Sequence, residues 1–175
     1  MKKVLLVSIV LLSVCGLAFA ADSAGAPLFG PGNFSLQADV DIGYGFGVSG
    51  GGDFGIGSFK IGPIPFTYGV AARVGYDMGD WNYVALDVLG TVRMSWNSLF
   101  PQVGFVNKLE SYIGLGLGAG FYSYSLLGVN QTGSTFSVAS IEGNNYYITK
   151  SLAINLEEGY YGYYGGLKVG VLFKL

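Results

Sequence analysis

The chain ends on Gly166-Leu167-Lys168-Val169-Gly170-Val171-Leu172-Phe173-Lys174-Leu175, and this stretch decides the fold. Period-2 alternation places every second residue, from Leu167 to Leu175, on one wholly apolar face. A hydrophobic strand at the end of a chain exposes a row of free backbone N–H and C=O groups. The pattern therefore predicts that another strand of the same chain pairs with this edge.

The predicted partner is the segment 34–48, which alternates in the same way. Its apolar side chains share one face, and Asp39 and Asp41 lie on the other. Pairing the first strand with the last closes a barrel that is apolar outside and polar inside, which is the pattern of a transmembrane β-barrel. The sequence thus predicts an all-β, eight-stranded, antiparallel up-and-down transmembrane β-barrel over residues 34–175.

Composition supports this class. The chain has 30 Gly, 13 Tyr and 12 Phe, only 11% charged residues and a mean hydropathy of +0.48. After residue 20 no apolar run is long enough for a membrane-spanning helix, so a closed barrel is the way to satisfy the backbone in lipid. The alternation predicts eight strands: 34–48, 66–78, 81–96, 99–107, 110–125, 134–148, 151–162 and 166–175.

The connections between these strands predict the orientation of the barrel. The turns near 79, 108 and 149 are short, which is typical of the periplasmic end. The Gly- and Pro-rich stretch 49–65 and the segment 126–133 are longer, and we expect them to be outer loops.

The last strand also resembles the carboxyl-terminal assembly signal of bacterial outer-membrane proteins. In this signal a polar residue, a glycine, an aromatic and a final hydrophobic residue alternate to the end, here as Lys168, Gly170, Phe173 and Leu175. Together with the order of the strands, the chain resembles the small eight-stranded outer-membrane barrels of the OmpA, OmpX, OmpW and opacity-protein type. The resemblance implies an outer-membrane protein of a diderm bacterium that contacts outer-membrane lipid and is inserted by the barrel-assembly machinery.

The first twenty residues form a predicted secretory signal peptide. Two lysines precede an apolar core over 4–17, and Ala18-Phe19-Ala20 provides a small-x-small cleavage site. Lipidation at Cys15 is the alternative, but the valine before this only cysteine is a poor fit to a lipoprotein box. Cleavage near Ala20 leaves 21–33 as a loose periplasmic lead-in.

Charge and residue types exclude several function classes. Loss of the two signal-peptide lysines leaves seven basic against eleven acidic residues, a net charge near −4 that argues against nucleic acid as a partner. The chain has no histidine, so Ser-His and Cys-His nucleophilic schemes are not available. We expect no catalytic residues, no metal site, no cofactor and no enzymatic activity.

The inward positions of the strands predict a charge network in the lumen. Its members are Asp39, Asp41, Arg73, Asp77, Asp87, Arg93, Glu110, Glu157 and Lys168. Arg73 and Asp87 lie at similar distances from the turn near 79, which predicts an ion pair between adjacent strands. Glu142 also counts as inward on this pattern. Because an eight-stranded barrel has barely enough interior for its own side chains, the network favours a largely plugged lumen.

Two functions follow from this sequence interpretation. The first is a structural and surface-interaction role, in which outer loops contact an external ligand or a host or cell surface; the apolar loop candidates are Phe54, Ile56, Phe59 and Ile61. The alternative is a narrow channel or an OmpW-like transporter of small apolar solutes. A soluble lipocalin-like barrel is the rival at the level of fold, and it predicts apolar residues inside and charges outside.

Overall fold

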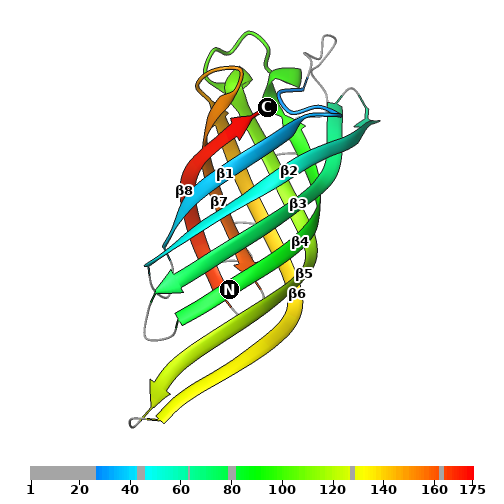
Figure 1. Cartoon of the computed structure of the whole chain (residues 1–175). Coiled ribbons are helices and arrows are strands. Elements are labelled where there is room, and N and C mark those ends of the chain that lie inside the picture. The colour runs from blue at the N-terminus through cyan, green and yellow to red at the C-terminus, as the bar shows by residue number, and fades with distance from the viewer. Residues whose placement is uncertain (1–26, 43–45, 63, 79–81, 127–128, 162–163) are drawn as a thin grey trace, which may run out of the picture.

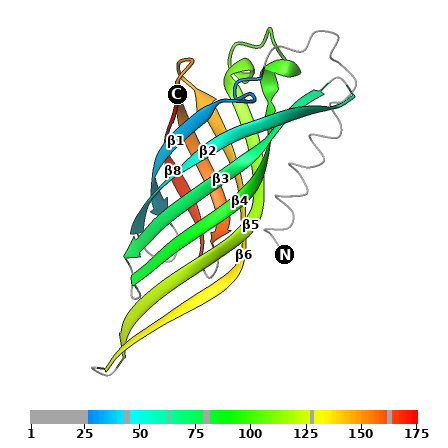
Figure 2. The ribbon, with the colours of Figure 1, turned by 45° about the vertical axis from the view of Figure 1, so that its right-hand side comes forward.

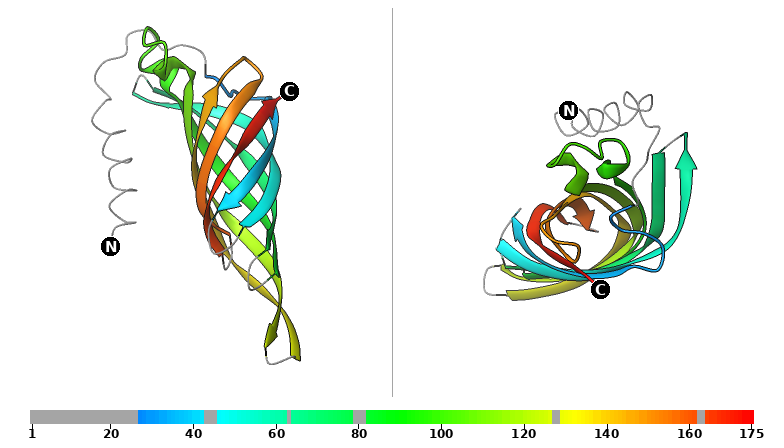
Figure 3. Two further views of the ribbon diagram at one scale, coloured as in Figure 1. Left: turned by 90° about the vertical axis from the view of Figure 1, so that its left-hand side faces the viewer. Right: turned by 90° about the horizontal axis from the view of Figure 1, so that it is seen from above.

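The computed structural model describes residues 27–42, 46–62, 64–78, 82–126, 129–161 and 164–175, and these are mostly β-strand (Figure 1). The strands are β1 (Phe34–Ile42), β2 (Phe46–Ile61), β3 (Ile64–Met78), β4 (Asn82–Ser95), β5 (Leu109–Leu126), β6 (Val129–Tyr147), β7 (Leu152–Tyr161) and β8 (Tyr164–Lys174). Each pairs antiparallel with its neighbours in the chain, and β1 pairs with β8. The predicted closed eight-stranded barrel is confirmed, and Figure 3 shows the ring from above. Among the described residues, no helix is long and apolar enough to cross a membrane.

The seam between β1 and β8 closes the ring as the last strand predicts. Asp41 lies opposite Lys168, and the pairing continues to Ser35 opposite Lys174. Beyond it, the backbone N–H of Leu175 donates to the carbonyl of Phe34 at 2.8 Å. The edge of β8 is therefore covered by the chain's own first strand.

The apolar side chains form the outer wall, and most charged residues of the strands are enclosed. Val40, Leu115 and Val171 are 40%, 65% and 51% exposed, whereas Asp39 and Arg73 are 5% and 3% exposed. A soluble barrel has the reverse arrangement, so the lipocalin-like alternative is wrong. The inside-out pattern is the one that lipid requires.

The expected strand 34–48 is in fact a hairpin, and the expected outer loop 49–65 is mostly β2. Ile42 pairs with Phe46 across residues 43–45, which lie outside the described residues. The turn was hidden because Ile42 and Phe46 are four residues apart, so the apolar alternation stays in phase on both sides of it.

Glycines in β2 make room for side chains rather than for a loop. A Cβ built on Gly51 would lie 2.7 Å from Cδ of Arg73, its register partner on β3. The Arg73 side chain thus occupies space that only a glycine leaves free. The glycine-rich run is therefore part of a strand and not the expected flexible connection.

The expected strand 99–107 is also wrong. This stretch belongs to the connection between β4 and β5, which includes two short 3₁₀ turns, Trp96–Ser98 and Val106–Lys108. Its apolar residues cover the barrel end, where Leu99 packs with Ile64 and Met94. The missed β2 and the false strand 99–107 cancel, which is why the expected number of strands was still correct.

These two errors also changed the assignment of ends. The chain enters β1 and leaves β8 at one end, here called the terminal end, where the β2–β3, β4–β5 and β6–β7 connections also lie (Figure 1). The β1–β2, β3–β4, β5–β6 and β7–β8 connections lie at the other, or distal, end. The sequence-based expectation that the turns near 79, 108 and 149 share one end of the barrel is thus wrong. The expected outer loop at 49–65 is wrong as well.

The expected loop 126–133 lies mostly within a long hairpin. We call the part of β5 and β6 formed by Tyr122–Leu126 and Val129–Phe136 the distal ribbon, and it projects beyond the other strands at the distal end (Figure 2). Its two strands pair continuously, from Tyr122 opposite Gly133 to Leu126 opposite Val129.

Residues 27–33 are not a loose lead-in. Phe29 is only 1% exposed, and the backbone N–H of Gly32 donates to the carbonyl of Gly55 at 2.8 Å. Because β2 extends to Ile61, it offers these residues a surface that the sequence interpretation lacked. The predicted signal peptide 1–20, its cleavage site and residues 21–26 lie outside the described residues.

Candidate functional site: the charged interior of the barrel

The structure places all nine residues of the expected lumen network inside the barrel. Their exposures run from 0% for Glu110 and Glu157 to 6% for Asp77. Each comes from the inward face of an alternating strand, as in β1, where every second residue is buried. The alternation alone therefore located these side chains, but not their partners.

Asp53 joins the two arginines and was missed by sequence reasoning. It is 1% exposed, and its Oδ1 accepts hydrogen bonds from Nη2 of Arg73 at 3.1 Å and from Nη2 of Arg93. It lies on β2, in the stretch expected to be a loop. Extending the period-2 pattern of β1 through the hairpin would have put it inside.

Glu157 is the second centre of the network. Its Oε2 accepts from Nε and Nη2 of Arg73 at 3.3 and 3.1 Å and from the Tyr112 hydroxyl at 2.8 Å. Its Oε1 accepts from the Tyr161 hydroxyl at 2.8 Å and lies 4.0 Å from Nζ of Lys168. Four side chains thus surround one fully buried carboxylate.

Glu110 completes the network on the other side of Arg93. Its Oε1 accepts from Nη1 of Arg93 at 2.9 Å and from Nδ2 of Asn145 at 3.0 Å. Asn155 then donates to Oδ1 of Asn145 and to the Tyr112 hydroxyl, each at 2.8 Å. These amide bonds connect the Glu110 side of the network to the Glu157 side.

Arg73 and Asp87 do not form the expected ion pair. They are direct register partners on β3 and β4, so the expected common height is confirmed. The guanidinium nevertheless binds Asp53 and Glu157, and among the described residues it forms no ion pair with Asp87. Two carboxylates held by other strands accept three charge-assisted hydrogen bonds from Arg73, two at Oε2 of Glu157 and one at Oδ1 of Asp53.

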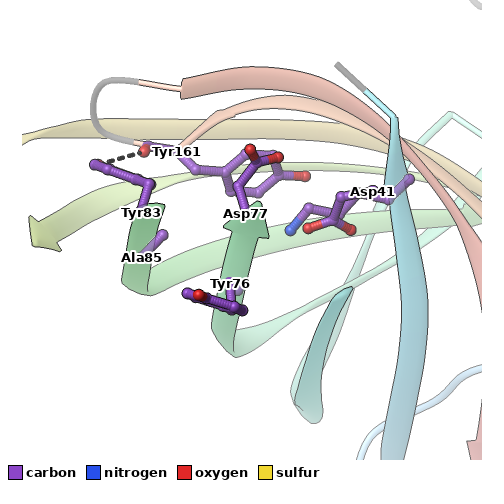
Figure 4. A pocket seen from close by; sticks show the side chains of 8 residues that line it. Asp41, Tyr76, Asp77, Tyr83, Ala85 and Tyr161 are labelled. Atoms are coloured by element: carbon purple, nitrogen blue, oxygen red, sulfur yellow. Dashed lines mark hydrogen bonds between the residues drawn. The ribbon is translucent and has the colours of Figure 1, made fainter. Parts of the chain in front are cut away.

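Aspartates gather toward the distal end of the interior. Asp39 accepts from Nε2 of Gln37 at 3.0 Å, and Asp41 accepts from the Ser49 hydroxyl at 2.6 Å. Asp41 and Asp77 line a hollow of about 10 Å³ together with Lys168, Tyr83 and Tyr161 (Figure 4). That volume is about the space of one water molecule. In the part of the chain that the structure describes, no group of three acidic side chains is arranged to hold a metal ion.

Glu142 lies on the outside of the barrel instead of the inside. It is the direct register partner of Glu158, and neither is buried. The inward residues of β6 are the odd-numbered ones from Ala139 to Tyr147. The weak alternation of this strand gave the wrong phase.

The four residues of the expected assembly signal occupy different environments. Lys168 is buried with its Nζ 3.6 Å from the centre of the Tyr161 ring, while Phe173 and Leu175 are exposed on the outer wall. A Cβ on Gly170 would lie 2.3 Å from Oδ1 of Asp39, so the glycine is explained by local space. Recognition of these residues by the assembly machinery remains a prediction.

The expected loop candidates Phe54, Ile56, Phe59 and Ile61 lie on β2 and are exposed. β2 runs toward the terminal end, which is opposite to the distal ribbon. The Phe59 ring stacks on Phe66 of β3 with 5.4 Å between ring centres. These residues thus form part of the apolar wall and not a loop surface.

Comparison with known proteins adds the fold and little else. No protein-family model matches the chain, and no curated protein matches its sequence. The N-terminal β-barrel domain of Pseudomonas aeruginosa OprF is similar with a TM-score of 0.58 and 15% identity, covering 83% of this chain and 99% of that one. A de novo designed transmembrane β-barrel has a TM-score of 0.51 and 20% identity, covering 87% of this chain and 100% of that one.

Ail, the attachment invasion locus protein of Yersinia pestis, gives a TM-score of 0.51 with 14% identity, over 83% of this chain and 99% of that one. All three are barrels of similar size to this chain, and all are too distant in sequence to carry a function across. By its strand order, its inside-out pattern and these likenesses, the chain has the fold of the small eight-stranded outer-membrane β-barrels.

Proposed function

We propose that the protein is a non-catalytic integral protein of the outer membrane of a diderm bacterium, which presents the distal ribbon as a surface for pairing with an extended segment of another polypeptide. The observation that carries the interaction role is the open edge of β6. β7 begins to pair with β6 only at Ala139, so over Val129–Phe136 no described strand pairs with the second edge of β6.

The membrane location is supported by the outer wall. Exposed Val, Leu, Ile and Phe side chains surround the barrel on every strand, whereas Asp53 and the nine residues of the lumen network are enclosed. No other environment satisfies both the apolar wall and the closed hydrogen-bonded ring so well. The longest projection from such barrels is on the outer side, so the distal ribbon faces outward from the cell.

A plugged lumen is part of the proposal. Support comes from the ion pairs of Arg73 with Glu157 and of Arg93 with Asp53, which cross the interior between strands that are not neighbours, and from the small size of the hollow beside Asp41. A transporter of apolar solutes needs an apolar entrance, which Phe54 and Ile56 could have lined as part of an outer loop. Both residues belong to β2 on the outer wall, so they do not support such an entrance.

The ribbon edge lacks the features that protect natural edges. The sequence has no charged residue from Ser111 to Ile141, and Val129–Phe136 has no proline. Natural proteins usually protect open edges with lysine, proline or bulges. An unprotected edge is suited to β-strand addition, in which backbone hydrogen bonds provide the affinity. The absence of charge fits an uncharged extended segment as partner.

Selection of peptides against the intact protein in lipid nanodiscs tests this function. A display library of ten-residue peptides should yield uncharged, β-branched sequences on the unmodified protein. The edge-blocked variant Ser134→Pro should lose this enrichment. Ser123→Pro, on β5, is not a suitable control because it breaks native pairing. Asn82→Ala, on β4, therefore serves as the control. Enrichment that is equal on Ser134→Pro and on the unmodified protein would remove the edge as the binding surface.

Membrane location and the plugged lumen need separate measurements. The protein should fractionate with the outer membrane and show heat-modifiable migration on a gel. It should also stay silent in planar bilayers over many insertions. Stable conductance that changes with Arg93→Ala would contradict the plugged lumen and indicate a channel instead.

A further inference from the structure

The segment Pro27–Asn33 lies across the mouth of the barrel at the terminal end (Figure 3). Leu28 is held at both backbone groups: its N–H donates to the Ser95 hydroxyl at 2.8 Å, and its carbonyl accepts from Nζ of Lys174 at 2.6 Å. On the other side, Gly55 exchanges backbone hydrogen bonds with Gly32 and Asn33 at 2.8 and 3.0 Å. The segment is thus attached to β4, β8 and β2.

Two apolar side chains of this segment cover the interior. The Phe29 ring centre lies 4.6 Å from Cζ of Arg93, and the Tyr112 ring centre lies 4.7 Å from the same atom. Leu28 packs against the cluster that contains Tyr147 and Leu172. Phe29 therefore shields a guanidinium that already binds two carboxylates, which excludes water from the ion pairs.

Three polar atoms near this cover have no hydrogen-bond partner among the described residues: Nε of Arg93, Oε2 of Glu110 and the hydroxyl of Tyr147. A buried polar group without a partner is unfavourable, and more so when it is charged. Water entering from the mouth would satisfy these atoms. The closed arrangement is thus opposed by hydration and held by the contacts of residues 27–33.

The surface of β2 that contacts the segment has room for it only because residue 55 is a glycine. A Cβ on Gly55 would lie 2.4 Å from the Gly30 carbonyl oxygen and 3.2 Å from Cε1 of Phe29, and its three nearest atoms all belong to this segment. Register in β2 shifts between Gly55 and Gly57, directly beside these contacts. The irregularity of β2 therefore coincides with the place where the segment docks.

We propose that Pro27–Asn33 is a removable stopper, which seals the Arg93 network from solvent at the terminal end and can leave its seat while the barrel stays closed. The barrel does not need the stopper for its own pairing, because β1 begins at Phe34 and pairs with β2 and β8 without it. The inference is independent of the proposed binding by the distal ribbon.

A cysteine reporter inside the mouth tests the stopper. Thr67 is 1% exposed and is the register partner of Arg93, and Cys15 is the only native cysteine. In a Cys15→Ser, Thr67→Cys background, the rate of reaction with a cationic methanethiosulfonate reagent reports access from the terminal end. We expect slow reaction in this background and a rate at least about tenfold higher when Gly55→Ala is added, equivalent to about 1.4 kcal/mol.

The matched control is Gly75→Ala, another interior glycine. Its Cβ would meet only ordinary contacts, 3.5 Å from Cβ of Ser49 and 3.6 Å from Oδ2 of Asp41. It should leave the reporter rate unchanged. Equal rates for the Gly55 and Gly75 variants, with heat-modifiable migration retained in both, would overturn the proposal.

Two further measurements keep the test decisive if Gly55→Ala does not fold. Phe29→Ala should accelerate the reporter without changing β2, whereas Phe34→Ala, on the outer wall at the same end, should not. In the unmodified protein, amide hydrogen exchange at Leu28 and Gly32 should be faster than at Gln37 of β1. If the Leu28 and Gly32 amides exchange as slowly as the Gln37 amide, the segment opens only together with the barrel, and the stopper proposal is rejected.

Discussion

Asp53 is the residue whose replacement tests the interior network most directly. Asp53→Asn keeps the size and one acceptor oxygen but removes the charge that Arg73 and Arg93 share. Each arginine then retains one carboxylate, Glu157 or Glu110. Removing one partner of a buried ion pair costs about 3–5 kcal/mol, and the retained pairs place this substitution near 3 kcal/mol. The unfolding equilibrium constant should therefore rise on the order of a hundredfold.

Equilibrium urea unfolding of the protein in lipid vesicles, followed by tryptophan fluorescence and by gel migration, measures this change. The matched control is Asp41→Asn, because Asp41 is equally buried but forms no ion pair among the described residues and accepts only from Ser49. It should change the free energy of unfolding by less than about 1 kcal/mol. If Asp53→Asn and Asp41→Asn shift the unfolding midpoint equally, the network does not depend on Asp53 and the reasoning fails.

Further predictions concern glycine packing and a surface charge pair. Gly143→Ala should destabilise the barrel by about 1–3 kcal/mol, because the new Cβ would lie 2.5 Å from both Cζ and the hydroxyl oxygen of Tyr112. Urea unfolding should show no such loss for Gly90→Ala, whose Cβ would meet nothing closer than 3.8 Å. Glu158→Lys should stabilise by about 0.2–1 kcal/mol, since it places a cation directly opposite Glu142. The gain should shrink in 1 M salt compared with low salt; a gain unaffected by salt would contradict an electrostatic cause.

The sequence predicted which residues are inside far better than where each strand begins. Alternation needs only the order of residues, so Asp39, Arg73 and Arg93 were assigned to the interior without any knowledge of their partners. The β1–β2 turn was missed because alternation stays in phase across it. Strand boundaries depend on such turns, and period-2 patterning carries no signal for them when the connection has an odd number of residues.

The partners inside the network depend on contacts that are distant in the sequence. Arg73 and Glu157 are 84 residues apart, and only the closed ring brings them together. A nearby register partner, Asp87, was the expected choice because sequence reasoning compares adjacent strands. Barrel curvature brings side chains from opposite walls within reach in a narrow lumen, which pairwise register does not describe.

The stopper was missed for a related reason. Phe29 stands in a Pro- and Gly-rich stretch with no periodicity, which is typical of an irregular segment. That interpretation of the backbone is right, but it says nothing of whether an irregular segment has a binding surface. The surface is formed by β2, β4 and β8 together and exists only in the assembled barrel.

The meeting of Phe34 and Leu175 at the seam has a topological consequence. Because the first and last strands are hydrogen-bonded neighbours, the ring has no privileged starting strand, and a circularly permuted chain can make the same eight pairings. A linker joining the present ends, with new ends opened between Leu126 and Val129 at the tip of the distal ribbon, preserves every pairing of the wall. In such a permutant the closing seam moves to the β5–β6 pair. The chain then ends on β5 instead of β8, although the finished barrel has the same shape.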